Sequence, residues 1–129
     1  MRVSREKFAE NREKILSVAG VLFRENGFDG VGVADIMKAA GLTHGGFYGH
    51  FASKDDLMAQ ACARGFEVSG AHWRKLAERA PDDPMAAIAA AYLSAAHRDH
   101  PGDGCVVAAL GPEAARQAGP VRRAITEGV

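Results

Sequence analysis

A tight corner joins two short helical patterns within residues 32–51. The first pattern places apolar residues on one helical face, at Val33, Ile36, Met37 and Ala40. Gly41 then ends this helix, because a residue without Cβ readily takes the left-handed conformation that a sharp reversal requires. Thr43 follows as the expected N-cap of the next helix. The spacing predicts a helix-turn-helix.

The second helix of the pair is expected over residues 44–50, about two turns in all. Phe47 and Phe51 would anchor it to the core. The remaining residues would face outward: His44, Gly45, Gly46, Tyr48, Gly49 and His50. A short, glycine-rich helix can lie close to a phosphate backbone, and a recognition helix brings its N-terminal residues to base edges in the major groove. The pattern therefore favours contact with double-stranded DNA.

Further motifs surround this pair in a fixed order. They are Arg12-Glu-Lys-Ile-Leu, Leu22-Phe-Arg-Glu-Asn-Gly-Phe, Val33-Ala-Asp-Ile, Ala40-Gly-Leu-Thr, Phe47-Tyr48 and Phe51-Ala-Ser-Lys-Asp-Asp-Leu57. Over residues 9–69 their order and spacing resemble the DNA-binding domain of TetR-type (TetR/AcrR) transcriptional repressors. The resemblance implies an all-α protein: an N-terminal three-helix DNA-binding domain, a long linking fourth helix, and a partial C-terminal helical domain for effector binding and dimerisation over residues 70–129.

The resemblance also implies which positions contact DNA. They are Gly32, Thr43, His44, Gly45, Gly46, Tyr48, Gly49, His50 and Lys54. Tyr48 is expected to reach a phosphate with its hydroxyl while its ring packs, and Lys54 is a second phosphate candidate. Three positions depart from the family pattern: His44 replaces the more usual Lys or Arg, Gly32 replaces a capping Ser or Thr, and Gly49 replaces a larger residue. Direct base readout is therefore expected to be sparse.

Composition excludes several other classes. The chain has 129 residues, 47% hydrophobic and 25% charged, which suits one globular core. No apolar run approaches the ~20 residues of a membrane span, and no apolar signal core follows the first residues. A bacterial cytoplasmic protein is expected, associated with the nucleoid when bound to DNA. Cys62 and Cys105 lack metal-finger spacing, so no metal and no cofactor are expected.

Net charge neither supports nor excludes DNA binding. The chain carries a formal charge of +0, and residues 1–51 hold seven lysines and arginines against six aspartates and glutamates. Affinity for DNA comes mostly from neutralised phosphates. Contact must therefore depend on where charges lie, on helix N-termini that offer N–H groups, and on two copies acting together.

Two long helices are expected around the helix-turn-helix. The first runs over about residues 5–26, and Asn26-Gly27 ends it. The second is the long fourth helix, over residues 54–79, where Ser53 and Asp56 resemble a capping box. Such a helix would connect the DNA end of the molecule to a second, helical part.

Three more helical segments are expected after residue 80. Asp83 as N-cap and Pro84 open the first of them. Its apolar stripe comprises Met85, Ile88, Ala89, Tyr92, Leu93 and Ala96. A polar hinge over residues 97–104 follows, then a helix from near Cys105 to about Gln117, kinked at Gly111-Pro112, and a last helix from Pro120. Members of the family generally continue with further helices, so the sequence resembles a fragment.

The resemblance implies a homodimeric repressor on a palindromic operator, released when a small-molecule effector of unknown identity tilts the long helix. The nearest candidate pocket residues are Phe66, Trp73, Met85, Tyr92 and Cys105. For each of them a plain core role is the competing interpretation. Cys105 follows Gly104 at an expected helix start, which favours a thiolate, so electrophile or oxidant sensing stands beside a packing role.

Two alternatives stay open. One is a module of the same fold that binds a ligand but not operator DNA. The other is a thiol-based enzyme that uses Cys105 with His97 or His100 and Asp99, although only nearness in sequence supports it. Operator binding would separate the main interpretation from the first alternative, and turnover of a thioester or similar substrate would be needed for the second.

Overall fold

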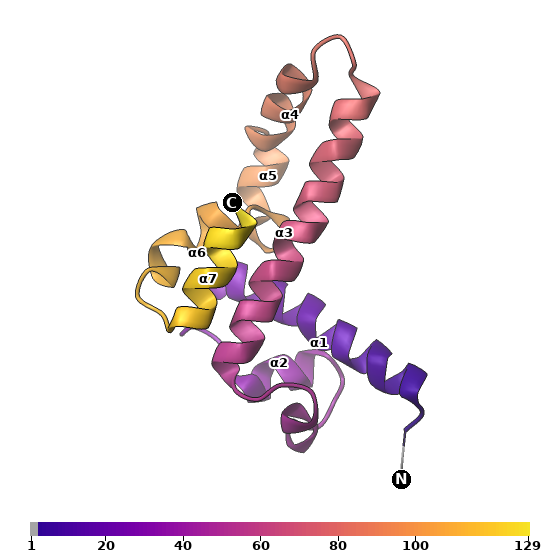
Figure 1. Ribbon diagram of the computed structural model, residues 1–129, viewed down its shortest axis with the longest axis vertical. Coiled ribbons are helices and arrows are strands. Elements are labelled where there is room, and N and C mark those ends of the chain that lie inside the picture. The colour runs from indigo at the N-terminus through magenta and orange to yellow at the C-terminus, as the bar shows by residue number, and fades with distance from the viewer. Residues whose placement is uncertain (1–2) are drawn as a thin grey trace.

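The computed structural model describes residues 3–129, and every regular element in this range is a helix. Met1 and Arg2, one of the basic residues counted above, lie outside the described residues. The elements, with η marking a 3₁₀-helix, are α1 (Arg5–Asn26), α2 (Val33–Ala39), η1 (His44–Gly49), α3 (Lys54–Arg79), α4 (Pro84–Tyr92), α5 (Ala95–Asp99), η2 (Pro101–Asp103), α6 (Val106–Ala114) and α7 (Gly119–Gly128) (Figure 1). The all-α expectation is confirmed.

Local signals in the sequence set the ends of α1. Ser4 caps its start, because the Ser4 hydroxyl accepts a hydrogen bond from the N–H of Lys7 at 3.1 Å. Gly27 ends it with a φ of 81°, and the Gly27 N–H donates to the carbonyl of Phe23 at 2.7 Å. The predicted bounds of this helix are confirmed.

The corner between α2 and η1 has the predicted left-handed glycine. Gly41 adopts a φ of 73°, and the N–H of Leu42 donates to the Met37 carbonyl at 2.9 Å. The second element differs from expectation, since η1 is a 3₁₀-helix rather than an α-helix, and the Thr43 side chain makes no capping bond. Three of the six residues of η1 are glycines, which lower helix propensity by about 1 kcal/mol each.

The long helix α3 begins where its capping signal predicts. The Ser53 hydroxyl accepts from the N–H of Asp56 at 3.1 Å, and the Asp56 carboxylate accepts from the N–H of Ala52 at 3.0 Å. The helix has 26 residues, which corresponds to roughly 39 Å. Its first half crosses α1, and its second half runs beside α4 as a hairpin that projects from the rest of the molecule (Figure 1).

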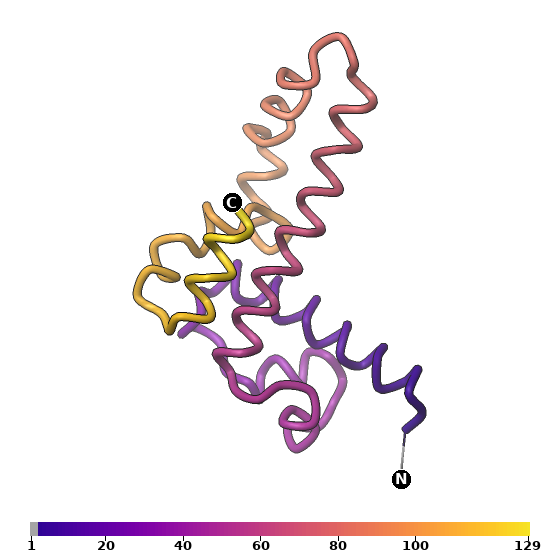
Figure 2. The backbone as a smooth tube through the Cα atoms, in the orientation of Figure 1, coloured from indigo at the N-terminus to yellow at the C-terminus, as the bar shows by residue number. Residues whose placement is uncertain are grey.

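One hydrophobic core joins the helix-turn-helix to the later helices. Its centre is aromatic: Phe23, Phe28, Phe47 and Phe51 are all at most 2% exposed. The C-terminal helices complete it, with buried side chains at Val106, Leu110, Ala114 and Val121. Figure 2 shows α7, the yellow end of the chain, returning to lie beside α3. The helix-turn-helix and the C-terminal segment therefore share one core.

Several bounds after residue 83 differ from the prediction. The Asp83 carboxylate accepts from the Ala86 N–H at 3.1 Å as expected, but α4 stops at Tyr92 because Ser94 caps a new helix, α5. The stripe predicted to run to residue 96 is wrong, and its members Met85 and Leu93 are 72% and 80% exposed. The predicted hinge contains the end of α5 and all of η2, α6 stops at residue 114, and α7 starts beside Pro120 as expected.

Glycine is required at residue 41 for conformational reasons alone, because a Cβ there would meet nothing within 4 Å. We expect Gly41→Ala to lower the free energy of unfolding by about 1–2 kcal/mol, the cost of a left-handed alanine. Urea denaturation followed by circular dichroism measures it. Gly45→Ala is the matched control, since Gly45 also faces open space but has no positive φ. Equal losses in both variants would contradict the conformational explanation.

Candidate nucleic-acid interface

The recognition element, residues 43–50, presents a low and glycine-rich surface. Tyr48 is its most prominent side chain, 69% exposed. The Tyr48 ring is braced edge-on by the buried Phe47, with ring centroids 5.0 Å apart and an interplanar angle of 81°. The other exposed members are Thr43, His44, Gly45, Gly46 and Gly49. The tyrosine hydroxyl therefore stands above a surface that a phosphate backbone can approach closely.

The start of α2 offers less to a phosphate than the sequence suggested. The backbone N–H of Gly32 donates to the carboxylate of Asp35 at 3.1 Å. This contact satisfies one of the free N–H groups of the helix start and adds a negative charge there. A phosphate at this end must use another N–H of the first turn.

The outward orientation expected for His50 is wrong. Its ring stacks on Phe8 of α1, with centroids 4.1 Å apart and planes 21° apart. Its Nδ1 atom is buried without a hydrogen-bond partner among residues 3–129. Burial, and then the positive charge of Arg12, lower the pKa of His50. His50 thus joins the recognition element to α1 instead of projecting from it.

Arg12 makes a second link between α1 and the end of the recognition element. Its guanidinium lies 5.1 Å from the centroid of the Phe51 ring, a cation–π distance. It also donates a hydrogen bond to the side chain of Gln60 on α3. Neither Phe8 nor Arg12 was predicted as a site residue, although their i, i+4 spacing on one face of a helix was a usable signal. Both act by positioning the recognition element.

Lys54 is the first residue of α3 and is partly buried. It follows the Ser53 cap directly, so its ammonium stands at a helix N-terminus where the free N–H groups and the dipole also favour an anion. Asp55 and Asp56 lie in the same turn and oppose this effect. The positive potential of Lys54 and the helix N-terminus is therefore confined to a small area by these two carboxylates.

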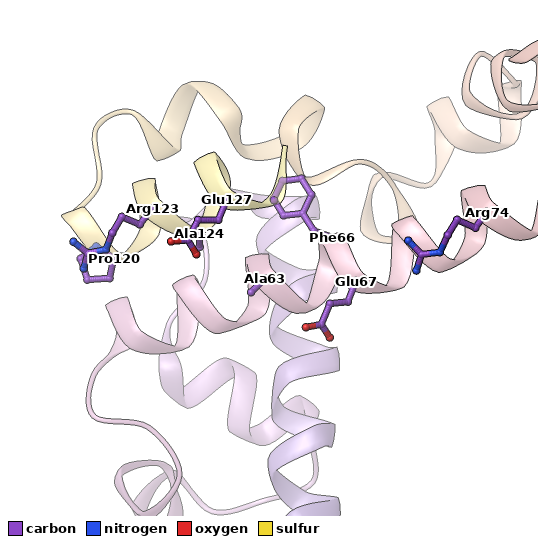
Figure 3. A pocket seen from close by; sticks show the side chains of 9 residues that line it. Ala63, Phe66, Glu67, Arg74, Pro120, Arg123, Ala124 and Glu127 are labelled. Atoms are coloured by element: carbon purple, nitrogen blue, oxygen red, sulfur yellow. The ribbon is translucent and has the colours of Figure 1, made fainter.

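The residues predicted to line an effector pocket do not form one group. Trp73 lines the larger cleft, about 700 Å³, between α1, α3 and residues 91–104. Phe66 lines a shallower one of about 570 Å³ between α3 and α7, where Figure 3 shows its ring directed toward α7. Met85 is exposed and lines neither cleft. Tyr92 packs against Trp73 at 5.9 Å between ring centroids, and its interaction with the Cys105 thiol raises the pKa of Tyr92.

The side chains proposed for a thiol enzyme face other partners. His97 Nδ1 contacts the Tyr92 carbonyl at 2.7 Å, and His100 Nδ1 contacts the Ala96 carbonyl at 2.8 Å. Asp99 accepts two hydrogen bonds from Arg98. The described residues therefore form no thiol–imidazole pair at Cys105. Cys62 is buried, and desolvation raises its pKa to about 11, which keeps that thiol protonated at neutral pH.

No group of three or more His, Cys, Asp or Glu side chains within residues 3–129 is placed to hold a metal ion. No helix in the same range has the length and apolar content needed to cross a membrane.

The N-terminal half of the chain is similar to known transcriptional regulators. The family model for bacterial regulatory proteins, tetR family, matches residues 15–61. The HTH-type transcriptional regulator AcrR of Shigella flexneri is 31% identical over 87 residues, covering 67% of this chain and 40% of that protein. The HTH-type transcriptional repressor AcnR of Corynebacterium jeikeium is 34% identical over 84 residues, covering 65% and 41%. The chain spans about two fifths of the length of these relatives.

Solved structures share the fold over nearly the whole chain. The reduced form of NemR from E. coli superposes with a TM-score of 0.78 at 24% identity, covering 92% of this chain and 63% of that one. A TetR-family transcriptional regulator from Agrobacterium tumefaciens gives 0.78 at 24%, covering 93% and 64%. The order of helices is thus a known arrangement.

The partly buried position of His50 makes stability depend on pH. Its pKa is lowered in the folded chain, so below about 6.5 the unfolded chain binds more protons than the folded one. The free energy of unfolding should therefore fall as pH drops below about 6.5, and level off below the folded-state pKa. Urea denaturation at about pH 7.5 and about pH 5.5 should show a smaller difference for His50→Gln than for the parent.

The exposed His44 supplies the control for this measurement. His44→Gln removes a histidine from the same element without removing the stack, so it should keep the pH dependence of the parent. If His50→Gln and His44→Gln change the pH dependence equally, burial of His50 is not its source.

Proposed function

The chain belongs, through residues 15–61, to the tetR family of bacterial regulatory proteins, and from this premise we propose that it regulates transcription by binding double-stranded DNA. The observation that carries the proposal is the recognition element itself. Its Tyr48 is exposed on a glycine-rich surface, while the neighbouring Phe47 is fully buried and Phe51 nearly so. The element is therefore both open to DNA and held rigidly by the core.

The contacts with DNA come mainly from the phosphate side. The Tyr48 hydroxyl and the Lys54 ammonium bind phosphates, and the glycines at residues 45, 46 and 49 let the backbone approach. Thr43 and His44 stand at the start of the element, where base edges are reached in helix-turn-helix proteins. With few long side chains, sequence preference depends on few base contacts and on DNA shape.

The protein acts as a homodimer on a palindromic operator. The helical part of one recognition element, η1, has six residues and reads only a few base pairs. A second copy one helical turn away doubles them. The curated relative AcnR is named a repressor, which supports repression as the outcome. A small molecule bound among the helices after residue 60 releases the DNA. Such a protein works in the bacterial cytoplasm, where the DNA is.

A ligand-binding module without operator binding is the second candidate. Two observations favour it: the Gly32 N–H is already bound to Asp35, and the charge of the N-terminal part is nearly balanced. The enzyme alternative has less support, because Nδ1 of each of its two histidines binds a backbone carbonyl and the matched relatives carry the names of transcriptional regulators.

DNA binding is tested by fluorescence anisotropy against fragments that flank the protein's own gene, at two salt concentrations. Tyr48→Phe removes one hydroxyl and should weaken binding by at least about tenfold, since a hydrogen bond to a charged group contributes about 1.5–3 kcal/mol. Lys54→Gln should weaken binding to all fragments alike and lower the slope of log affinity against log salt by about 1.

Lys75→Gln is the matched control, because Lys75 is an exposed lysine of the same helix outside its first turns. It should bind as the parent does. Saturable, salt-dependent binding that prefers one palindromic fragment supports the proposal. Equal affinity for that fragment and for random DNA, at both salt concentrations, would favour the module without an operator.

A further inference from the structure

The larger cleft has a wall that belongs to the DNA-binding domain itself. Its lining on α1 includes Leu16, Gly20 and Arg24, and its lining on α3 includes Gly65 and Trp73. The opposite wall is residues 91–104. A ligand in this cleft would therefore touch the helix that also carries Phe8 and Arg12.

Arg24 has one nitrogen left for a ligand. Its Nε and Nη2 both donate to the Gly102 carbonyl, the former at 2.9 Å. The third, Nη1, has no hydrogen-bond partner within residues 3–129. It lies 3.3 Å from the Cβ position of Gly20 and 3.1 Å from that of Gly65. These two glycines line the cleft, so Nη1 lies at the cleft wall beside two residues that have no side chain. On the Gly65 side the nearest neighbour is Cγ2 of Val106, 2.6 Å from the Cβ position.

The electrostatics around Arg24 favour an anion. Burial lowers the pKa of its guanidinium, because loss of water disfavours the cation. The nearby carboxylates of Asp103 and Glu25 oppose this shift only in part. The other arginine of the cleft, Arg64, is paired with the carboxylate of Glu13. A carboxylate is the group that matches a guanidinium edge best, through charge-assisted hydrogen bonds.

The other end of the cleft is aromatic. Trp73 is flanked by His97, with ring centroids 6.3 Å apart, and by His72 at 4.9 Å. Along α3, Trp73 lies eight residues beyond Gly65, or about 12 Å at 1.5 Å per residue. The cleft thus has a cationic end and an aromatic end at the separation of a small elongated molecule.

We propose that this cleft binds an aromatic carboxylate, with the carboxylate on Nη1 of Arg24 and the ring against Trp73. The role of such a ligand as effector rests on the proposed function, whereas its binding does not. Arg24 also ties α1 to η2 through the Gly102 carbonyl. A carboxylate on Nη1 would be a second acceptor on the guanidinium that already holds this carbonyl, so the ligand acts on the junction between the DNA-binding domain and the C-terminal helices.

Direct titration tests the proposal without DNA. Trp73 is the only tryptophan of the chain, so its fluorescence reports the cleft. The probe is phenylbutyrate, and the matched ligand is phenylbutyramide, which has the same ring and chain but no charge. We expect saturable quenching by the acid, and at least tenfold weaker binding of the amide. Equal binding of the two, or no saturation by the acid, overturns the proposal.

Variants locate the carboxylate. Arg24→Gln should weaken phenylbutyrate binding at least tenfold, and circular dichroism shows whether it folds. Gly20→Ala tests the site even if Arg24→Gln does not fold. It adds a methyl 3.3 Å from Nη1 and favours the helix. It too should weaken binding. The matched control is Gly70→Ala, because Gly70 lies 3.4 Å from Nη1 of Arg74 in the same i, i+4 arrangement outside this cleft. Equal weakening by both alanines overturns the assignment to Arg24.

The titration and the DNA assay fail separately. If phenylbutyrate binds as described but the protein does not bind DNA, the carboxylate site is supported and the proposed operator binding is wrong. If the protein binds its operator and phenylbutyrate does not bind, the regulator stands and this inference is wrong.

Discussion

Burial of two phenylalanines is the constraint on which the rest of the structure depends. The recognition element is a short 3₁₀-helix with three glycines and has little tendency to form alone. Phe47 and Phe51 are 0% and 2% exposed, and their rings lie 5.7 Å apart within the core. Each such burial stabilises by about 1.5–3 kcal/mol. An element that is weak by itself is thereby held in one orientation, with Tyr48 outside.

The helix α1 connects this element to the other end of the molecule. Near its start, Phe8 stacks on His50 and Arg12 lies over Phe51. Near its end, Arg24 holds the Gly102 carbonyl of η2 and faces the larger cleft. The same rigid helix therefore contacts both the candidate DNA surface and the candidate ligand site, which gives coupling between the two a simple mechanical basis.

Local signals predicted most of the N-terminal half correctly. Ser53 with Asp56 marked the start of the long helix, and Gly27 and Gly41 marked two helix ends, because capping and left-handed glycine are decided by neighbours in sequence. The bounds predicted for residues 93–104 were wrong, because Ser94 starts a new helix inside an apolar run. The orientation predicted for His50 was also wrong, since alternation around a helix cannot show that Phe8, far away in sequence, covers one face of that ring.

The sequence by itself determined the helical class, the helix-turn-helix with its left-handed glycine, the long helix, and the resemblance that names the family of residues 15–61. These depend on spacings of a few residues, which physical chemistry constrains locally. Only the tertiary structure decided that His50 turns inward and that Nη1 of Arg24 is left without a partner beside Gly20 and Gly65. Packing between distant segments sets which face of a side chain is covered and which donor is left over, and a linear pattern does not contain that information.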